Sequence, residues 1–154
     1  MKIRRYIRLV VMAIAACFVA VGCTQNNGDI GEWFGEWHLR SIEINGTDDA
    51  SYTGDVLWKF QNNIVEMVVV NDTGHSHTEH YGTWSADGSV LTLYFTHSDD
   101  LNPAGSAKYS PPTQTLLPAG VTELKIHKLS SSEIILQYDP AADRSIVYTL
   151  RKRG

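Results

Sequence analysis

Cysteine is almost absent from this chain of 154 residues, which contains only two. Cys17 lies inside an apolar N-terminal run and Cys23 lies just after it, so the remainder has no thiol for a disulfide or a thiolate metal site. The apolar run itself, residues 9–21, has 13 residues, too few for a spanning helix of about 20. We therefore expect the folded part to be stabilised by packing alone.

Basic residues are also scarce outside the N-terminus. The four at positions 2, 4, 5 and 8 precede the apolar run, and without them Lys and Arg fall from 13 to 9 against 17 acidic residues. The resulting net charge of −8 argues against binding of nucleic acid or anionic lipid by the folded domain.

Motifs of the common catalytic classes are missing as well. The chain has no Gly-x-Ser-x-Gly, no phosphate-binding loop and no candidate catalytic cysteine. We therefore expect a protein that is not an enzyme and that carries no resident cofactor.

The first 22 residues have the layout of a targeting segment. A basic head and a short apolar run end in Ala20-Val21-Gly22-Cys23, which resembles the bacterial lipobox. The resemblance implies cleavage before Cys23 and acylation of that residue, for example with palmitate, which would anchor the protein to a membrane. Residues 1–22 are thus a predicted lipoprotein signal peptide and residues 23–31 a tether. Thr24, in place of Asp, favours an outer-membrane location in the cell envelope.

Residues 32–154 are predicted to form a single all-β domain. Strand-forming residues are frequent, and apolar and polar residues alternate, as in Leu91, Leu93 and Phe95. Turn residues separate eight segments, which span 36–44, 55–60, 64–70, 75–85, 90–96, 121–129, 133–138 and 144–151. Eight short strands joined mostly by short connections favour an up-and-down antiparallel barrel.

A family resemblance supports this expectation. The lipobox, the Gly35-x-Trp37 start and the closing Tyr148-x-Leu150 resemble the lipocalin-like lipoproteins of Bacteroides-type bacteria. The resemblance implies that Gly35 and Trp37 lie at the barrel base, with Trp37 beneath an arginine of the last strand. Arg151 and Arg144 are both candidates for that arginine.

In such a barrel the tether joins the base, and the longer connections lie at the mouth, where ligands of these barrels bind. We expect a monomer that binds a small apolar or amphipathic molecule there, with Trp58, Tyr81 and Phe95 as candidate contacts. The alternative is a protein- or glycan-interaction module whose barrel is filled by side chains. A mouth cavity of about 300 Å³ or more would favour the first hypothesis.

A histidine-rich strand offers a candidate metal site. On a strand, His75, His77 and Glu79 share one face and His80 takes the other. A three-residue hairpin loop at 86–88 would place His77 opposite His97, whereas a two-residue turn would place Thr78 there. Imidazole and carboxylate suit zinc, but a wet, polar strand end is the preferred interpretation.

Residues 97–120 form the longest irregular segment and contain four of the five prolines. A loop of this length is usually functional or disordered, and we expect either a mobile lid, a partner surface or plain disorder.

Overall fold

The computed structural model describes residues 30–71 and 76–154, and most of its regular structure is β-strand. The strands are β1 (Gly35–Ile44), β2 (Thr47–Asp48), β3 (Val56–Gln61), β4 (Ile64–Asn71), β5 (Ser76–Asp87), β6 (Val90–Phe95), β7 (Gly120–Leu129), β8 (Glu133–Ala141) and β9 (Arg144–Lys152). Three short 3₁₀ helices accompany them: η1 (Gly31–Trp33), η2 (Ala107–Tyr109) and η3 (Thr113–Thr115). Within the described residues, no helix has the length and hydrophobicity needed to cross a membrane.

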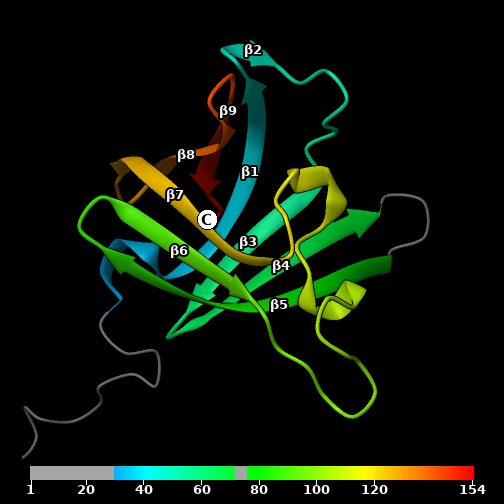
Figure 1. Cartoon of the computed structure of the whole chain (residues 1–154). Coiled ribbons are helices and arrows are strands. Elements are labelled where there is room, and N and C mark those ends of the chain that lie inside the picture. The colour runs from blue at the N-terminus through cyan, green and yellow to red at the C-terminus, as the bar shows by residue number, and fades with distance from the viewer. Residues whose placement is uncertain (1–29, 72–75) are drawn as a thin grey trace, which may run out of the picture.

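The sheet closes on itself. From β3 to β9 each strand pairs antiparallel with the next, β1 pairs with β3, and β1 also pairs with β9 along most of its length (Figure 1). β2 is a short addition at the end of β1. The predicted eight-stranded up-and-down barrel is therefore confirmed, and closure leaves no long open edge.

Connections differ between the two ends of the barrel. The turns β3–β4, β5–β6 and β7–β8 are short and lie at the base, where β1 begins and β9 ends (Figure 1). The long connections β1–β3 and β6–β7 lie at the opposite end, the mouth. The chain thus enters and leaves the barrel at its base, as the strand order predicts.

The β5–β6 hairpin differs from both predicted registers. Asp87 pairs with Val90, so the turn consists of Gly88 and Ser89, and residues 86 and 87 belong to the strand. Gly88 has a φ of 56°, which suits a two-residue hairpin turn. This register does not set His77 opposite His97, and that prediction is wrong.

Trp37 closes the base, as the resemblance implies. Its side chain is fully buried, and its indole N–H donates to the carbonyl of Trp33 at 2.9 Å. The ammonium of Lys152 lies 4.4 Å from the centroid of the Trp37 ring and also donates to the Phe34 carbonyl. Gly35 has a φ of 115°, and a Cβ there would lie 2.8 Å from the Lys152 ammonium nitrogen. The backbone conformation therefore favours glycine here, and a larger residue would also displace the end of the Lys152 side chain.

The basic residue over Trp37 is Lys152, and neither arginine candidate occupies that place. Leu150 and Tyr148 are fully buried, so the two-residue period of β9 also points Lys152 inward and Arg151 outward. Arg144 starts β9 at the far end of the barrel, opposite Ala141. Burial lowers the pKa of Lys152.

Aromatic side chains fill the interior. The ring of Trp58 lies 6.0 Å from that of Tyr148 and 6.3 Å from that of Phe60, measured between centroids. Towards the base, Phe60 also contacts the rings of Trp33 and Trp84, each at 5.1 Å. These spacings are typical of packed aromatic pairs, so the barrel axis holds core and not an open channel.

The segment that joins β6 to β7 covers the mouth. Its Thr115 is fully buried and its Leu117 belongs to the core cluster. The Tyr148 hydroxyl donates to the Thr115 carbonyl at 2.9 Å, and His80 bonds the Ser110 carbonyl at 2.8 Å. This part of the predicted lid or disordered loop is an ordered plug, which we define as residues 110–117.

Replacing Trp37 with alanine should lower the free energy of unfolding by about 3–5 kcal/mol, because it removes a fully buried ring that closes the base. Urea denaturation measures the change. Val121→Ala is the control, since Val121 is 58% exposed and should shift stability by less than about 0.5 kcal/mol. Equal stability of the two variants would contradict the role of Trp37.

Candidate functional site: an aromatic cleft on the outer wall

The residues predicted to contact a ligand at the mouth are divided between the two faces of the barrel wall. Trp58 and Phe95 point inward and are buried in the core, beneath the plug. Tyr81 lies on the outer face, because its neighbours His80 and Gly82 point inward. The three residues therefore do not form one mouth site.

The predicted metal ligands do not form one site in the described residues. His77 and Glu79 share the outer face, with His77 Nε2 3.1 Å from Glu79 Oε1, and His80 points inward as the alternation predicts. His97 follows the end of β6 and its ring lies 6.3 Å from that of Tyr109. His75 falls outside the described residues. Among the residues the structure describes, no three acidic, histidine or cysteine side chains group as metal ligands would.

Two of the predicted residues, Tyr81 and His97, do meet, but on the outside of the barrel. With Tyr109 they line a cleft of about 330 Å³ on the outer side of β5. The remaining lining residues come from the β3–β4 turn and from β4 and β5: Asn63, Ile64, Gly82 and Thr83. We call this site the aromatic cleft.

The cleft forms because the chain leaves the sheet after Phe95. The ladder between β5 and β6 has its last pair at Thr83 and Tyr94. Beyond it, the chain turns outward and η2 packs beside β5 (Figure 1). Tyr109, at the end of η2, is thereby placed beside Tyr81, although the two are far apart in sequence.

Each tyrosine of the cleft is held by a carboxylate. The Tyr81 hydroxyl donates to Glu79 Oε2 at 2.5 Å, and this bond raises the pKa of Tyr81 to about 12. The same bond lowers the pKa of Glu79, helped by His77. The Tyr109 hydroxyl is bonded in the same way, to Asp99. Because neither hydroxyl rotates freely, the Tyr81 and Tyr109 rings keep a fixed orientation without a ligand.

Asp99 is the anchor for Tyr109 and for the start of the loop. Its Oδ2 accepts from the Tyr109 hydroxyl and the Lys108 ammonium, both at 2.8 Å. Its Oδ1 accepts from the backbone N–H groups of Leu101 and Asn102 and from the Asn102 side chain. The bond from Lys108, followed by those from Asn102 and Tyr109, holds the pKa of Asp99 well below its usual range.

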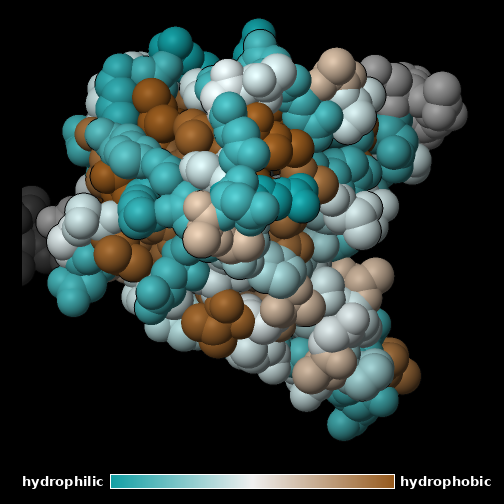
Figure 2. Space-filling model, turned by 45° about the horizontal axis from the view of Figure 1, so that its top comes forward, coloured by the Kyte–Doolittle hydropathy of each residue, from teal (hydrophilic) through white to brown (hydrophobic). Residues whose placement is uncertain are grey.

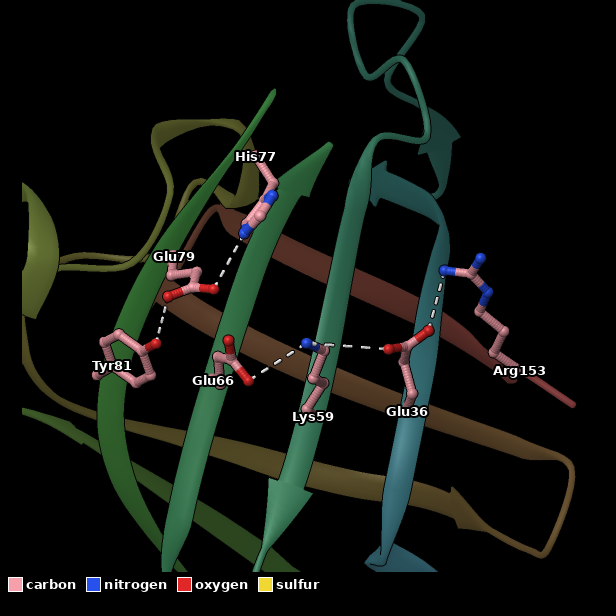
Figure 3. A network of polar contacts seen from close by, with 7 residues as sticks. All are labelled: Glu36, Lys59, Glu66, His77, Glu79, Tyr81 and Arg153. Carbon is pink, nitrogen blue, oxygen red and sulfur yellow. Dashed lines mark hydrogen bonds and ion pairs between the residues drawn. The ribbon is translucent and has the colours of Figure 1, made fainter. Parts of the chain in front are cut away.

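A row of charges borders the cleft. Glu36, Lys59 and Glu66 are directly opposite one another on β1, β3 and β4, and Tyr81 is the next residue in the row, on β5. Lys59 lies 3.4 Å from Glu66 and 4.0 Å from Glu36. Figure 3 shows the row continuing from Glu36 to Arg153. Exposed pairs of this kind contribute little stability, about 0–1 kcal/mol each, so they shape the surface more than they stabilise it.

Comparison with known proteins places this architecture in a family. The family model described as a lipocalin-like domain matches residues 16–144. The chain belongs to this lipocalin-like family. No curated protein matches it.

Two solved structures share the lipocalin-like fold. A lipocalin-like protein from Bacteroides uniformis ATCC 8492 is 21% identical, with a TM-score of 0.61, and the match covers 80% of this chain and 100% of that one. An uncharacterized protein from Bacteroides eggerthii DSM 20697 is 19% identical with the same TM-score of 0.61, covering 79% and 99% of the two chains. At these identities the likeness concerns the fold alone. The resemblance to lipocalin-like proteins of Bacteroides type is confirmed.

Sequence reasoning did not identify Tyr109 and Asn63 as site residues. Asn63 reads as an ordinary turn residue, and Tyr109 lies in a segment without periodicity. The signal that could have found Tyr109 is an aromatic residue in a polar loop that also contains Asp99 and Lys108. Figure 2 shows one face of the molecule, on which the hydrophobic patches are interrupted by hydrophilic side chains.

Asp99→Asn should loosen the loop beside the aromatic cleft, because the neutral amide cannot replace the charged acceptor of Lys108 and Tyr109. We expect the amides of Leu101 and Asn102 to exchange hydrogen roughly three- to tenfold faster. Asp100→Asn is the matched control and should leave exchange unchanged. Because the pKa of Asp99 is depressed, wild-type protection should persist as pH falls from 7 to about 4 and disappear only below that. Loss of protection near pH 6 would contradict this account.

Proposed function

We propose that the protein is a lipid-anchored lipoprotein of the cell envelope that binds a small glycan, one or two sugar rings, in the aromatic cleft. The observation that carries the proposal is the combination of a barrel filled by side chains with a preorganised cleft on its outer wall. The barrel then serves as a rigid scaffold. The proposal follows the alternative given by the sequence, a glycan-interaction module whose barrel is filled by side chains, and it assigns the binding site to the aromatic cleft.

The chemistry of the aromatic cleft fits a sugar. A pyranose ring has an apolar face, which packs on a flat aromatic ring, and a rim of hydroxyls that donate and accept hydrogen bonds. Tyr81 and Tyr109 supply rings, while Asn63 and Thr83 supply an amide and a hydroxyl that can each donate and accept. Ile64, which is 47% exposed, adds an apolar surface next to them.

The size of the cleft favours a small ligand over a protein. Its volume of about 330 Å³ is at the lower end of the range of small-molecule sites. A stable protein interface would bury roughly 800 Å² on each partner, far more than this cleft offers.

A second candidate function is the binding of a small amphipathic molecule at the mouth. One observation favours it: the indole N–H of Trp58 is buried without a hydrogen-bond partner among the described residues. A buried donor of this kind is usually satisfied by water or a ligand. Such a ligand would have to displace the plug and break the bond between Tyr148 and Thr115.

Titration calorimetry with free hexoses, N-acetylhexosamines and their disaccharides tests the glycan proposal. Tyr109→Ala should weaken binding about tenfold, the value of one aromatic stacking contact, whereas Tyr109→Phe keeps the ring and should retain most of the affinity. His127→Ala, which removes an exposed ring from β7, is the matched control. If no sugar in the panel binds, or if Tyr109→Ala and His127→Ala behave alike, the proposal is wrong.

The anchor is tested separately. Cys23→Ala should release the protein from the membrane fraction or block its processing, because it removes the residue that the lipobox pattern assigns to acylation. Immunoblotting of soluble and outer-membrane fractions measures the effect. Cys17→Ala, which lies inside the predicted signal peptide, should fractionate like the wild type. A Cys23→Ala protein that stays in the membrane fraction would overturn the lipoprotein assignment.

A further inference from the structure

A second cleft, of about 640 Å³, lies on the outer wall where β1 meets β9. Three arginines line it: Arg40 from β1, Arg151 from β9 and Arg153, which follows β9. His38, Thr149, Lys152 and Gly154 complete the lining, and we call this site the arginine groove. In a mature chain with a net charge of −8, four of the nine basic residues, the three arginines and Lys152, line this one groove.

A β-bulge places Arg40 in the arginine groove. The register between β1 and β9 shifts between Leu39 and Ser41, so Arg40 is an extra residue on β1. Leu39 and Ile42 both point inward, and Arg40 and Ser41 lie between them, outside the core. Bulges of this kind re-aim a side chain, and they are common next to binding sites.

His38 orients the Arg40 guanidinium. Arg40 can only donate, so His38 Nδ1 accepts its bond at 3.1 Å, and His38 Nε2–H must donate to the Gly54 carbonyl at 2.7 Å. This geometry requires the neutral imidazole with its proton on Nε2. The histidine therefore positions the arginine without adding charge of its own.

The three arginines differ in how far they are neutralised. Arg153 pairs with Glu36 at 3.0 Å, and Arg151 pairs with Glu133 at 2.5 Å. Glu133 also accepts from Lys128, so that carboxylate is shared between two cations. Arg40 has no carboxylate within ion-pair distance among the described residues. Its remaining N–H groups are available for an anion, and a guanidinium binds phosphate with two parallel bonds.

The position of the arginine groove indicates which anion it meets. Arg153 and Arg151 lie at the end of β9, at the base, beside Glu36 and His38 near the start of β1. Ile30 is seven residues after Cys23, so a lipid on Cys23 keeps the base within roughly 25 Å of the membrane surface. In the ring of eight strands the β1–β9 junction lies nearly opposite β5, so the aromatic cleft would face away from that surface.

We propose that the arginine groove binds the phosphate groups of anionic lipids and holds the β1–β9 wall against the membrane. The proposal rests on the proposed envelope location but not on the glycan cleft. It departs from the expectation, based on net charge alone, that the folded domain does not bind anionic lipid. The charge is segregated: the membrane-facing wall is locally basic, although the domain as a whole is acidic.

Vesicle sedimentation tests the proposal on the chain from Thr24 onward, which contains every described strand and core residue and carries no lipid of its own. The vesicles are phosphatidylcholine alone or phosphatidylcholine mixed with phosphatidylglycerol. We expect binding only to the mixed vesicles, weakening as salt is raised. Arg40→Gln should weaken it about fivefold, the effect of one basic residue beside an anionic membrane, and the Arg40→Gln, Arg153→Gln double variant further.

Lys125→Gln is the matched control, since Lys125 is an exposed cation of β7 paired with Asp139, and it should bind like the wild type. Circular dichroism confirms that each variant is folded. Equal binding by Arg40→Gln and Lys125→Gln, or no preference for phosphatidylglycerol, would overturn the proposal. Equally tight binding of a soluble sulfated polysaccharide would overturn the lipid assignment. Tyr109→Ala should still bind the vesicles, so failure of the glycan proposal is distinguishable from failure of this one.

Discussion

The pairing of β1 with β9 is the contact on which the rest of the structure depends. It joins the first and last strands, closes the sheet and brings Lys152 over the Trp37 ring at the base. A closed eight-stranded barrel has an interior just wide enough for side chains or one small ligand. Here the space is occupied by packed aromatic rings, and the plug places Thr115 and Leu117 over them. The described residues contain no cysteine, so packing and not a disulfide stabilises this part of the chain.

A filled interior moves the candidate binding surfaces to the outside of the wall. The aromatic cleft lies beside β5, and the arginine groove lies at the β1–β9 junction, on nearly opposite sides of the ring. The two sites arise from two departures from regular strands. The chain leaves β6 after Phe95 and returns beside β5, whereas a bulge at Arg40 adds an outward residue to β1. One chemistry suits a sugar ring and the other suits a phosphate.

Local patterns in the sequence were sufficient to predict the fold. Leu91, Leu93 and Phe95 alternate, and all three point inward, since a strand places every second residue on one face. Gly35 and Trp37 mark the base, since Gly35 has a positive φ and the Trp37 ring is buried beneath Lys152. The turn residues between segments predicted the strand order.

Long-range contacts were what the sequence could not supply. Moving or lengthening the turn near Gly88 by one residue changes which residues of β5 and β6 face each other. The sequence around Gly88 was compatible with more than one such register. Lys152 in place of an arginine is an exception, because the alternation of Tyr148 and Leu150 already places residue 152 on the inner face. Tyr109 reaches Tyr81 only through the path of an irregular loop, and no periodicity describes such a path.

The central claim is that the barrel interior is closed and that binding takes place on the outer wall. Titration with a fluorescent polyene fatty acid, excited by energy transfer from the buried tryptophans, tests this claim most directly. We expect no saturable transfer, because Trp58 lies in a packed core beneath the plug. Saturable one-to-one transfer that is lost in Trp58→Phe would show an interior site and contradict the account.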